Sequence, residues 1–266
     1  MSCSQCREGF VLPGEPTGSM QVGYQGAYYA MGAEGESSRA VIFLTDGYGL
    51  PLQNCKIMAD NLAQRLHCDV WVPDYLAGRP LVDVDDLGAP DRAGVKLSLF
   101  DKLKGMLFSV IPKIPAYISN RPSVVDKRVK EFILMLQNKK QYEKVGVVGY
   151  CWGGATAMRL AKGDLIRTAA MCHPAPFSEK DVKAIKIPTS WAVAEDDLFV
   201  SPSLRRRAEA ILSARKEKDN EFEYEFKEYP GTAHGFAARP NLNLPEIRAA
   251  YEAAFEQVVQ WFNRTL

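Results

Sequence analysis

The segment 144–161 constrains the fold of this chain more than any other part of the sequence. An apolar stretch, 144–148, leads into Gly-Tyr-Cys-Trp-Gly-Gly at 149–154, and a run of good helix formers follows at 155–161. Glycine has no Cβ atom, so it permits sharp turns and lets two backbones pass closely. We therefore expect a strand that turns abruptly into a helix, which is the repeating unit of an α/β protein.

The rest of the chain alternates apolar runs with helical patterns. The predicted strands are 40–45, 69–72, 144–148, 168–172, 188–193 and 221–228, and the predicted helices are 55–66, 124–139, 155–161, 203–216 and 246–262. Nearly continuous apolar strands are typical of parallel sheets that are covered on both faces. The pattern predicts one α/β domain over 1–266, with a mostly parallel central sheet and helices on both faces. The many glycines and prolines at about 76–123 predict a loop-rich, lid-like insertion with short helices.

Charge and hydropathy exclude several classes of partner. The net charge is +1 and hydrophobic residues make up 47% of the chain. This balance gives no electrostatic reason to bind nucleic acid or an anionic membrane. No apolar run approaches the roughly 20 residues of a membrane span, and the N-terminus lacks the pattern of a secretory signal. We expect a small-molecule substrate, and the sequence does not distinguish a monomer from a homodimer.

The cysteines indicate a reducing compartment. There are six in 266 residues, which is not the density of a disulfide framework, so the cytoplasm is the expected location. Cys3 and Cys6 form a CxxC pair, but a structural zinc site usually needs a second pair. We interpret this pair as incidental, and we expect neither a metal nor an organic cofactor.

Cys151 is the candidate nucleophile. Glycines two residues before and two residues after it match the nucleophile elbow G-x-S-x-G, with Cys in the place of Ser. Such a turn places the sulfur at a helix N-terminus, where backbone N–H groups and the helix dipole favour a thiolate. Taken alone, the pattern also fits a buried structural cysteine beside a tight turn.

Residues farther along the chain supply a base and an acid in the order that this elbow requires. The acidic run 195–197 follows the strand 188–193, and His234 lies in a loop after the strand 221–228. Ligand sites of open α/β sheets lie at this edge, beyond the carboxyl ends of the strands. Of the three histidines, His67 is expected on the surface or at a helix end. His173 fits either a pocket or a structural role.

These motifs resemble those of the dienelactone hydrolase family, within the α/β-hydrolases. The resemblance is carried by GYCWGG at 149–154, AEDDLFV at 194–200 and HGF at 234–236, with weaker support from VPD at 72–74 and DGYG at 46–49. It implies the α/β-hydrolase fold and a triad of Cys151, His234 and Asp197. It also implies an oxyanion hole made by the backbone N–H groups of Trp152 and Gly47.

The same resemblance suggests which residues bind the substrate. Asp46 stands where the family has an acidic residue that contacts the resting thiol, although that residue is more often Glu. The family holds a substrate carboxylate with arginines, for which Arg79 and Arg239 are the nearest matches, each one residue late. We expect Arg239 on the rim of the pocket. The remaining candidates are Tyr48, His173 and Phe236.

The sequence therefore predicts a cysteine-dependent hydrolase of small esters, lactones or thioesters. Its middle region, about 80–123, departs from the bacterial lactone hydrolases, so the substrate is not transferable. One alternative is a non-hydrolytic use of the same fold, as an isomerase, a cyclase or a binding protein. Another is a redox-sensing thiol, which requires an exposed resolving cysteine; Cys172 is the candidate nearest in sequence to Cys151.

Overall fold

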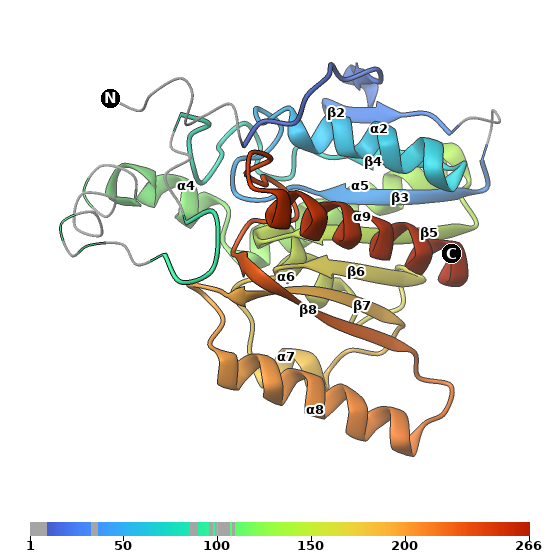
Figure 1. Ribbon diagram of the computed structural model, residues 1–266. Coiled ribbons are helices and arrows are strands. Elements are labelled where there is room, and N and C mark those ends of the chain that lie inside the picture. Colours follow the sequence, from blue (N-terminus) through green and yellow to red (C-terminus); the bar gives the residue numbers. More distant parts are fainter. Residues whose placement is uncertain are drawn as a thin grey trace.

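The computed structural model describes residues 10–32, 37–85, 90–95, 98, 100, 107 and 110–266. Its strands are β1 (Ser19–Gln21), β2 (Ala27–Ala30), β3 (Arg39–Leu44), β4 (Asp69–Val72), β5 (Lys144–Tyr150), β6 (Thr168–Cys172), β7 (Thr189–Asp196) and β8 (Tyr224–Ala233). They form one sheet in the order β1-β2-β4-β3-β5-β6-β7-β8. The pairs β1–β2 and β2–β4 are antiparallel and all other neighbours are parallel. The mostly parallel sheet is thus confirmed (Figure 1).

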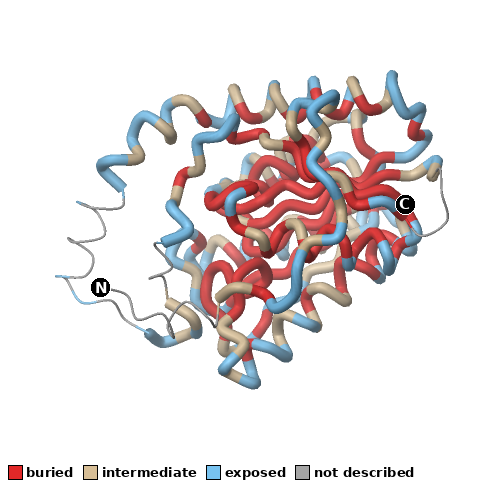
Figure 2. The backbone as a smooth tube through the Cα atoms, turned by 90° about the horizontal axis from the view of Figure 1, so that it is seen from above, coloured by how far each residue is buried: buried red, intermediate tan, exposed pale blue. Residues whose placement is uncertain are grey.

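Helices cover both faces of this sheet, as the sequence predicts. They are η1 (Val22–Tyr24), α2 (Asn54–Leu66), η3 (Ile111–Lys113), α4 (Ile114–Ser119), α5 (Pro122–Lys140), α6 (Trp152–Leu160), α7 (Glu179–Lys183), α8 (Pro202–Lys218) and α9 (Pro245–Thr265). Successive side chains of a strand point to opposite faces. Val41 and Phe43 of β3 accordingly join the core beneath α2 and α9, whereas Ile42 and Leu44 join the core on the side of α5 to α8. Figure 2 shows the resulting band of buried strands between exposed helix surfaces.

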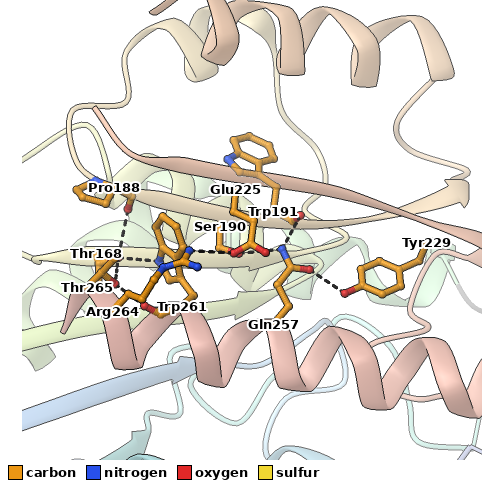
Figure 3. A network of polar contacts seen from close by, with 10 residues as sticks. All are labelled: Thr168, Pro188, Ser190, Trp191, Glu225, Tyr229, Gln257, Trp261, Arg264 and Thr265. Carbon is orange, nitrogen blue, oxygen red and sulfur yellow. Dashed lines mark hydrogen bonds and ion pairs between the residues drawn. The ribbon is translucent and has the colours of Figure 1, made fainter. Parts of the chain in front are cut away.

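Helix α9 is fastened to the strands that lead to the site by a buried polar network (Figure 3). The Gln257 amide donates to Ser190 Oγ at 3.0 Å and to the Trp191 carbonyl at 3.2 Å, and it accepts from the Tyr229 hydroxyl at 2.8 Å. The Trp261 indole donates to Thr168 Oγ1 at 2.8 Å. A buried polar network stabilises a fold when its groups find partners, and this one fixes the spacing of β6, β7 and β8.

Some element boundaries differ from the predicted ones. Strands β4 and β6 have the predicted bounds, but β8 begins at Tyr224 and continues to Ala233, later than the predicted 221–228. It tolerates Pro230 because it is the last strand of the sheet, where a missing N–H leaves no ladder partner unpaired. Strands β1 and β2 and helix α7 were not predicted from the sequence. These are only 3, 4 and 5 residues long, and β1 and α7 each contain a single apolar residue.

Parts of the predicted insertion and the N-terminal cysteine pair lie outside the described residues. Within the described part of 76–123, η3, α4 and the start of α5 are helical. His67 caps the C-terminus of α2 with a left-handed backbone, at φ 49°, and it is exposed, as expected. In the described ranges, no helix combines the length and the apolarity of a membrane span.

Candidate active site

Cys151 occupies a strained turn between β5 and α6. Its backbone has φ 51° and ψ −113°, a conformation that non-glycine residues rarely adopt. A Cβ atom on Gly149 would lie 2.2 Å from the Gly153 carbonyl oxygen, and one on Gly153 would lie 2.4 Å from the Leu44 carbonyl oxygen. Both positions therefore require glycine. The turn leaves Cys151 partly exposed at the N-terminus of a helix, where N–H groups have no partner within the helix.

The end of β7 leads to Asp197 through an irregular part of its ladder with β8. Ala194 pairs with Tyr229 and Asp196 pairs with Ala233, so the extra residues lie on β8; such irregularities are frequent next to active sites. Arg205 of α8 holds this segment, because its Nη1 donates to the carbonyls of Ala194 at 2.9 Å and Glu195 at 2.8 Å. Asp197 Oδ1 then accepts the Phe199 N–H at 2.8 Å, which leaves Oδ2 for another donor.

His234 contacts that second oxygen of Asp197. Its Nδ1 lies 2.7 Å from Asp197 Oδ2, and the two side chains are only 8% and 4% exposed. The neighbouring acids have other partners: Glu195 Oε2 accepts the Gly231 N–H at 2.6 Å, and Asp196 Oδ2 accepts the Gly94 N–H at 3.0 Å. Of the three consecutive carboxylates, Asp197 is the one that lies against the imidazole.

The charge of His234 depends on Cys151. Burial alone disfavours the imidazolium, but the negative charge of the Cys151 thiolate, together with Asp197, outweighs burial and raises the pKa of His234 to about 10. The second ring nitrogen, Nε2, makes no hydrogen bond of ordinary geometry to a described residue. An opposite charge close to a buried histidine favours its protonated form. Cys151 and Asp197 therefore favour the protonated form of His234.

The loop after β3 is held rigidly beside this group. The Gly47 carbonyl accepts the N–H groups of Leu81 at 2.7 Å and Val82 at 3.2 Å, and the Tyr75 hydroxyl donates to the Thr45 carbonyl at 2.7 Å. These contacts join the loop to the start of the predicted insertion. They hold Gly47, whose N–H is the second predicted donor of the oxyanion hole, in a defined backbone conformation.

Asp46 and Arg239 lie together in the same region. Asp46 Oδ1 accepts the Tyr48 N–H at 3.1 Å, so the shorter acid turns back onto its own loop. Burial raises the pKa of the Asp46 carboxyl, while the positive charge of Arg239 opposes that shift. The Arg239 guanidinium lies 5.6 Å from the centroid of the Tyr48 ring, and it donates to the His234 carbonyl at 3.3 Å.

Arg239 is only 7% exposed, so the expectation that it stands on the rim of the pocket is wrong. The charge of Asp46, the Tyr48 ring and the hydrogen bond to the His234 carbonyl offset part of the cost of burying this guanidinium. Arg79, in contrast, is exposed. Among the described residues its contacts are made by its backbone, whose carbonyl accepts the Asn120 side-chain amide at 2.8 Å.

His173 and Phe236 are buried close to His234. The ring centroids of His173 and His234 are 5.0 Å apart with an interplanar angle of 78°. Phe236 packs between His173, at 5.9 Å, and Tyr229, at 5.2 Å. With 3% exposure, Phe236 belongs to the hydrophobic core next to His173.

Two aromatic side chains near the site were not predicted. The Phe199 ring lies 4.8 Å from the His234 ring and is 60% exposed. Tyr117 of α4 contacts Trp152 edge-on at 6.3 Å, so the described part of the insertion reaches the residue next to Cys151. Phe199 stands two residues after Asp197, and this spacing could have placed it near the site. Tyr117 lies in a proline-rich stretch without a recognisable motif.

The other described cysteines do not match a resolving thiol. Cys55, Cys68 and Cys172 are all buried, and burial raises the pKa of each thiol to about 12. A redox partner for Cys151 needs an accessible thiolate. Cys172 therefore does not supply the exposed resolving cysteine that the redox alternative requires. Among the described residues, no group of His, Cys, Asp and Glu side chains is arranged to hold a metal ion.

Comparisons with known proteins identify the family of this chain. The model of the dienelactone hydrolase family matches residues 26–266. The hydrolase tropI of Talaromyces stipitatus is 30% identical over 263 residues, which cover 98% of this chain and 96% of that protein. The human carboxymethylenebutenolidase homolog is 22% identical over 232 residues, covering 86% and 83% of the two chains.

The fold is also found among solved structures. A dienelactone hydrolase-like promiscuous phosphotriesterase from metagenomic libraries superposes with a TM-score of 0.60 at 18% identity, covering 90% of this chain and 92% of that one. The family match spans nearly the whole sequence and includes every element that carries the candidate site. The chain therefore belongs to the dienelactone hydrolase family, with the α/β-hydrolase fold, and it is a hydrolase of small esters or lactones.

Proposed function

We propose that this hydrolase acts through Cys151 as nucleophile, His234 as general base and acid, and Asp197 as the group that orients His234. The observation that carries the proposal is the 2.7 Å contact between His234 Nδ1 and Asp197 Oδ2, next to a cysteine in a strained elbow. A base oriented by an acid beside a nucleophile is the arrangement that covalent acyl transfer needs.

The first half of the reaction forms an acyl-enzyme. The Cys151 thiolate attacks the carbonyl carbon, a C–S bond forms, and the carbonyl π electrons move to the oxygen. The backbone N–H groups of Trp152 and Gly47 stabilise this oxyanion. When the intermediate collapses, the C–O bond of the ester breaks. The leaving alkoxide takes the proton from the His234 imidazolium, and in a lactone it remains tethered to the acyl group.

The second half restores the enzyme. Neutral His234 takes a proton from water, and the resulting hydroxide adds to the thioester carbon. Collapse of this second intermediate breaks the C–S bond, releases the carboxylic acid product and returns the thiolate beside the imidazolium. Every bond and proton is accounted for by the three side chains, the substrate and one water molecule.

The test combines turnover with labelling of the thiol. Wild-type protein should hydrolyse p-nitrophenyl acetate, and mass spectrometry after rapid acid quenching should detect an acetyl group on Cys151. Iodoacetamide should abolish turnover with the label on Cys151, while the buried Cys55, Cys68 and Cys172 stay unlabelled in the folded protein. Cys151→Ala should lose turnover and keep its circular dichroism spectrum. Full activity in Cys151→Ala would exclude the mechanism. Acylation without release would favour a non-hydrolytic use of the fold.

A further inference from the structure

The strand order places His173 between two residues of the candidate triad. Cys151 follows β5 and Asp197 follows β7, and β6 lies between these two strands in the sheet. His173, the residue directly after β6, therefore lies between the nucleophile and the acid. The ring of His234, which comes from β8, has to extend over this position to reach Cys151. The 5.0 Å separation of the two imidazole rings agrees with that placement.

His173 is held in this place at a conformational cost. Its φ is 37°, in a region where non-glycine residues are strained and persist only if their surroundings fix them. The His173 N–H donates to the Ala192 carbonyl at 2.7 Å. The ring also meets Tyr150 at 6.1 Å and Phe236 at 5.9 Å. The side chain is thus fixed by aromatic neighbours on several sides.

The chemistry of the His173 ring is that of a neutral aromatic group. The residue is 1% exposed, and neither ring nitrogen forms a hydrogen bond with a described residue. Burial, together with the positive charges of His234 and Arg239, lowers the pKa of His173 well below its ordinary value. A neutral ring leaves the protonated form of its neighbour unopposed, whereas a second imidazolium would repel it.

We propose that His173 is a positioning residue, a neutral aromatic platform that holds the His234 ring in register with Cys151 and favours the thiolate–imidazolium pair. This inference rests on the proposed function of Cys151 and His234. Edge-to-face ring contacts have a defined geometry and a favourable electrostatic component. The contact at 78° thus restricts rotation of His234 about its side-chain bonds.

Other charged groups also face His234 and set the background for the test. They are the Cys151 thiolate after β5, the Asp197 carboxylate after β7, Asp46 in the loop after β3 and Arg239 in the loop of His234 itself. His173→Phe and His173→Leu leave all four in place and both remove the ring nitrogens. The two variants differ in that Phe keeps an aromatic ring, so the pair isolates the platform.

The readout is the pH dependence of Cys151 alkylation by iodoacetamide, which needs no substrate. In His173→Leu the thiolate should form at higher pH, with the acid limb of the profile raised by roughly half a pH unit, and kcat should fall roughly 3- to 10-fold with KM little changed. His173→Phe should match wild type in the profile and in kcat within about twofold. Thermal melts establish that each variant is folded, and His173→Met replaces the Leu variant if that one does not fold.

Two results would overturn the platform role. If His173→Phe shows the same fall in kcat and the same shift of the alkylation profile as His173→Leu, the ring nitrogens act instead of the aromatic ring. If His173→Leu matches wild type, the platform does not influence Cys151. Failure of the proposed function is distinguishable from both, because wild-type Cys151 would then resist alkylation or Cys151→Ala would remain active.

Discussion

His234 Nδ1 and Asp197 Oδ2 are 2.7 Å apart although the two residues are separated by 37 positions in the sequence. The contact depends on three features that lie outside both side chains. These are the parallel pairing of β7 with β8, the register shift between these strands near Asp196, and the Arg205 side chain that holds the end of β7. Backbone geometry therefore brings one of three adjacent carboxylates to the imidazole.

The first prediction separates these carboxylates. Asp197→Asn should lower kcat/KM by roughly 10³- to 10⁴-fold, because an amide no longer orients the imidazole in the productive tautomer. Asp196→Asn should change it by less than about threefold, since the side-chain contact of Asp196 within the described part of the chain is with the exposed Gly94 N–H. Steady-state kinetics on one activated ester measure both. A double variant, Asp197→Ala with His234→Ala, should be nearly as active as His234→Ala alone, because the two groups act as a unit. Additive losses would contradict this unit.

The second prediction concerns the protonation of His234. Its pKa is raised to about 10 chiefly by the negative charge of Cys151, against the effect of burial. Cys151→Ala removes that charge, so the imidazolium loses its largest support and the pKa should fall. Titration of the imidazole C–H resonances by NMR, with His67 as the exposed internal reference, measures the change. An unchanged pKa in Cys151→Ala would mean that the thiolate does not interact with this ring.

The third prediction tests whether Arg239 holds a substrate carboxylate. Two substrates that differ only in a carboxylate are compared in wild type and Arg239→Ala. If the anion is held, kcat/KM for the anionic substrate should fall by the equivalent of about 2–5 kcal/mol, with little change for the neutral one. Arg79→Ala is the matched control, because Arg79 is exposed and its described contacts are those of its backbone.

The buried position of Arg239 makes a second outcome informative. Its guanidinium also supports the His234 loop through the carbonyl contact at 3.3 Å, and its charge opposes the rise in the pKa of the Asp46 carboxyl. Equal losses on both substrates would therefore assign Arg239 to loop support. In that case the anionic group of the substrate would rest on the family resemblance alone.

The fourth prediction addresses the elbow. Gly153→Ala would place a Cβ atom 2.4 Å from the Leu44 carbonyl oxygen, so β3 and α6 would have to separate. We expect a loss of roughly 3–5 kcal/mol in the free energy of unfolding, or no folded protein. Gly163→Ala is the control, because its new Cβ would meet no atom closer than 3.7 Å. Urea denaturation of both variants gives the comparison, and equal stability would refute the steric argument.

The sequence predicts the central sheet well because its strands are buried on both faces and form continuous apolar runs. Cys151, Asp197 and His234 were proposed from the elbow, the order along the chain and the strand ends, and their catalytic roles stay predictions. His173 was left open between a pocket and a structural role, because one strand-end histidine carries no period or motif. The burial of Arg239 was missed, since it depends on Asp46 and Tyr48 from a loop far away in the sequence. The division into one domain, the cytoplasmic location and the oxyanion hole stay predictions.

Arg205 joins α8 to the last turn of backbone before the acid, through the carbonyls of Ala194 and Glu195 and an ion pair with Glu228 at 2.6 Å. Helices at the edge of a domain can open locally at lower free energy than the whole fold. If α8 detaches, Asp197 loses its support while β3, β5 and β6 remain paired. Turnover on heating should then decline before the far-ultraviolet circular dichroism changes. The contacts of Arg205 would thus set the thermal lifetime of the enzyme's activity.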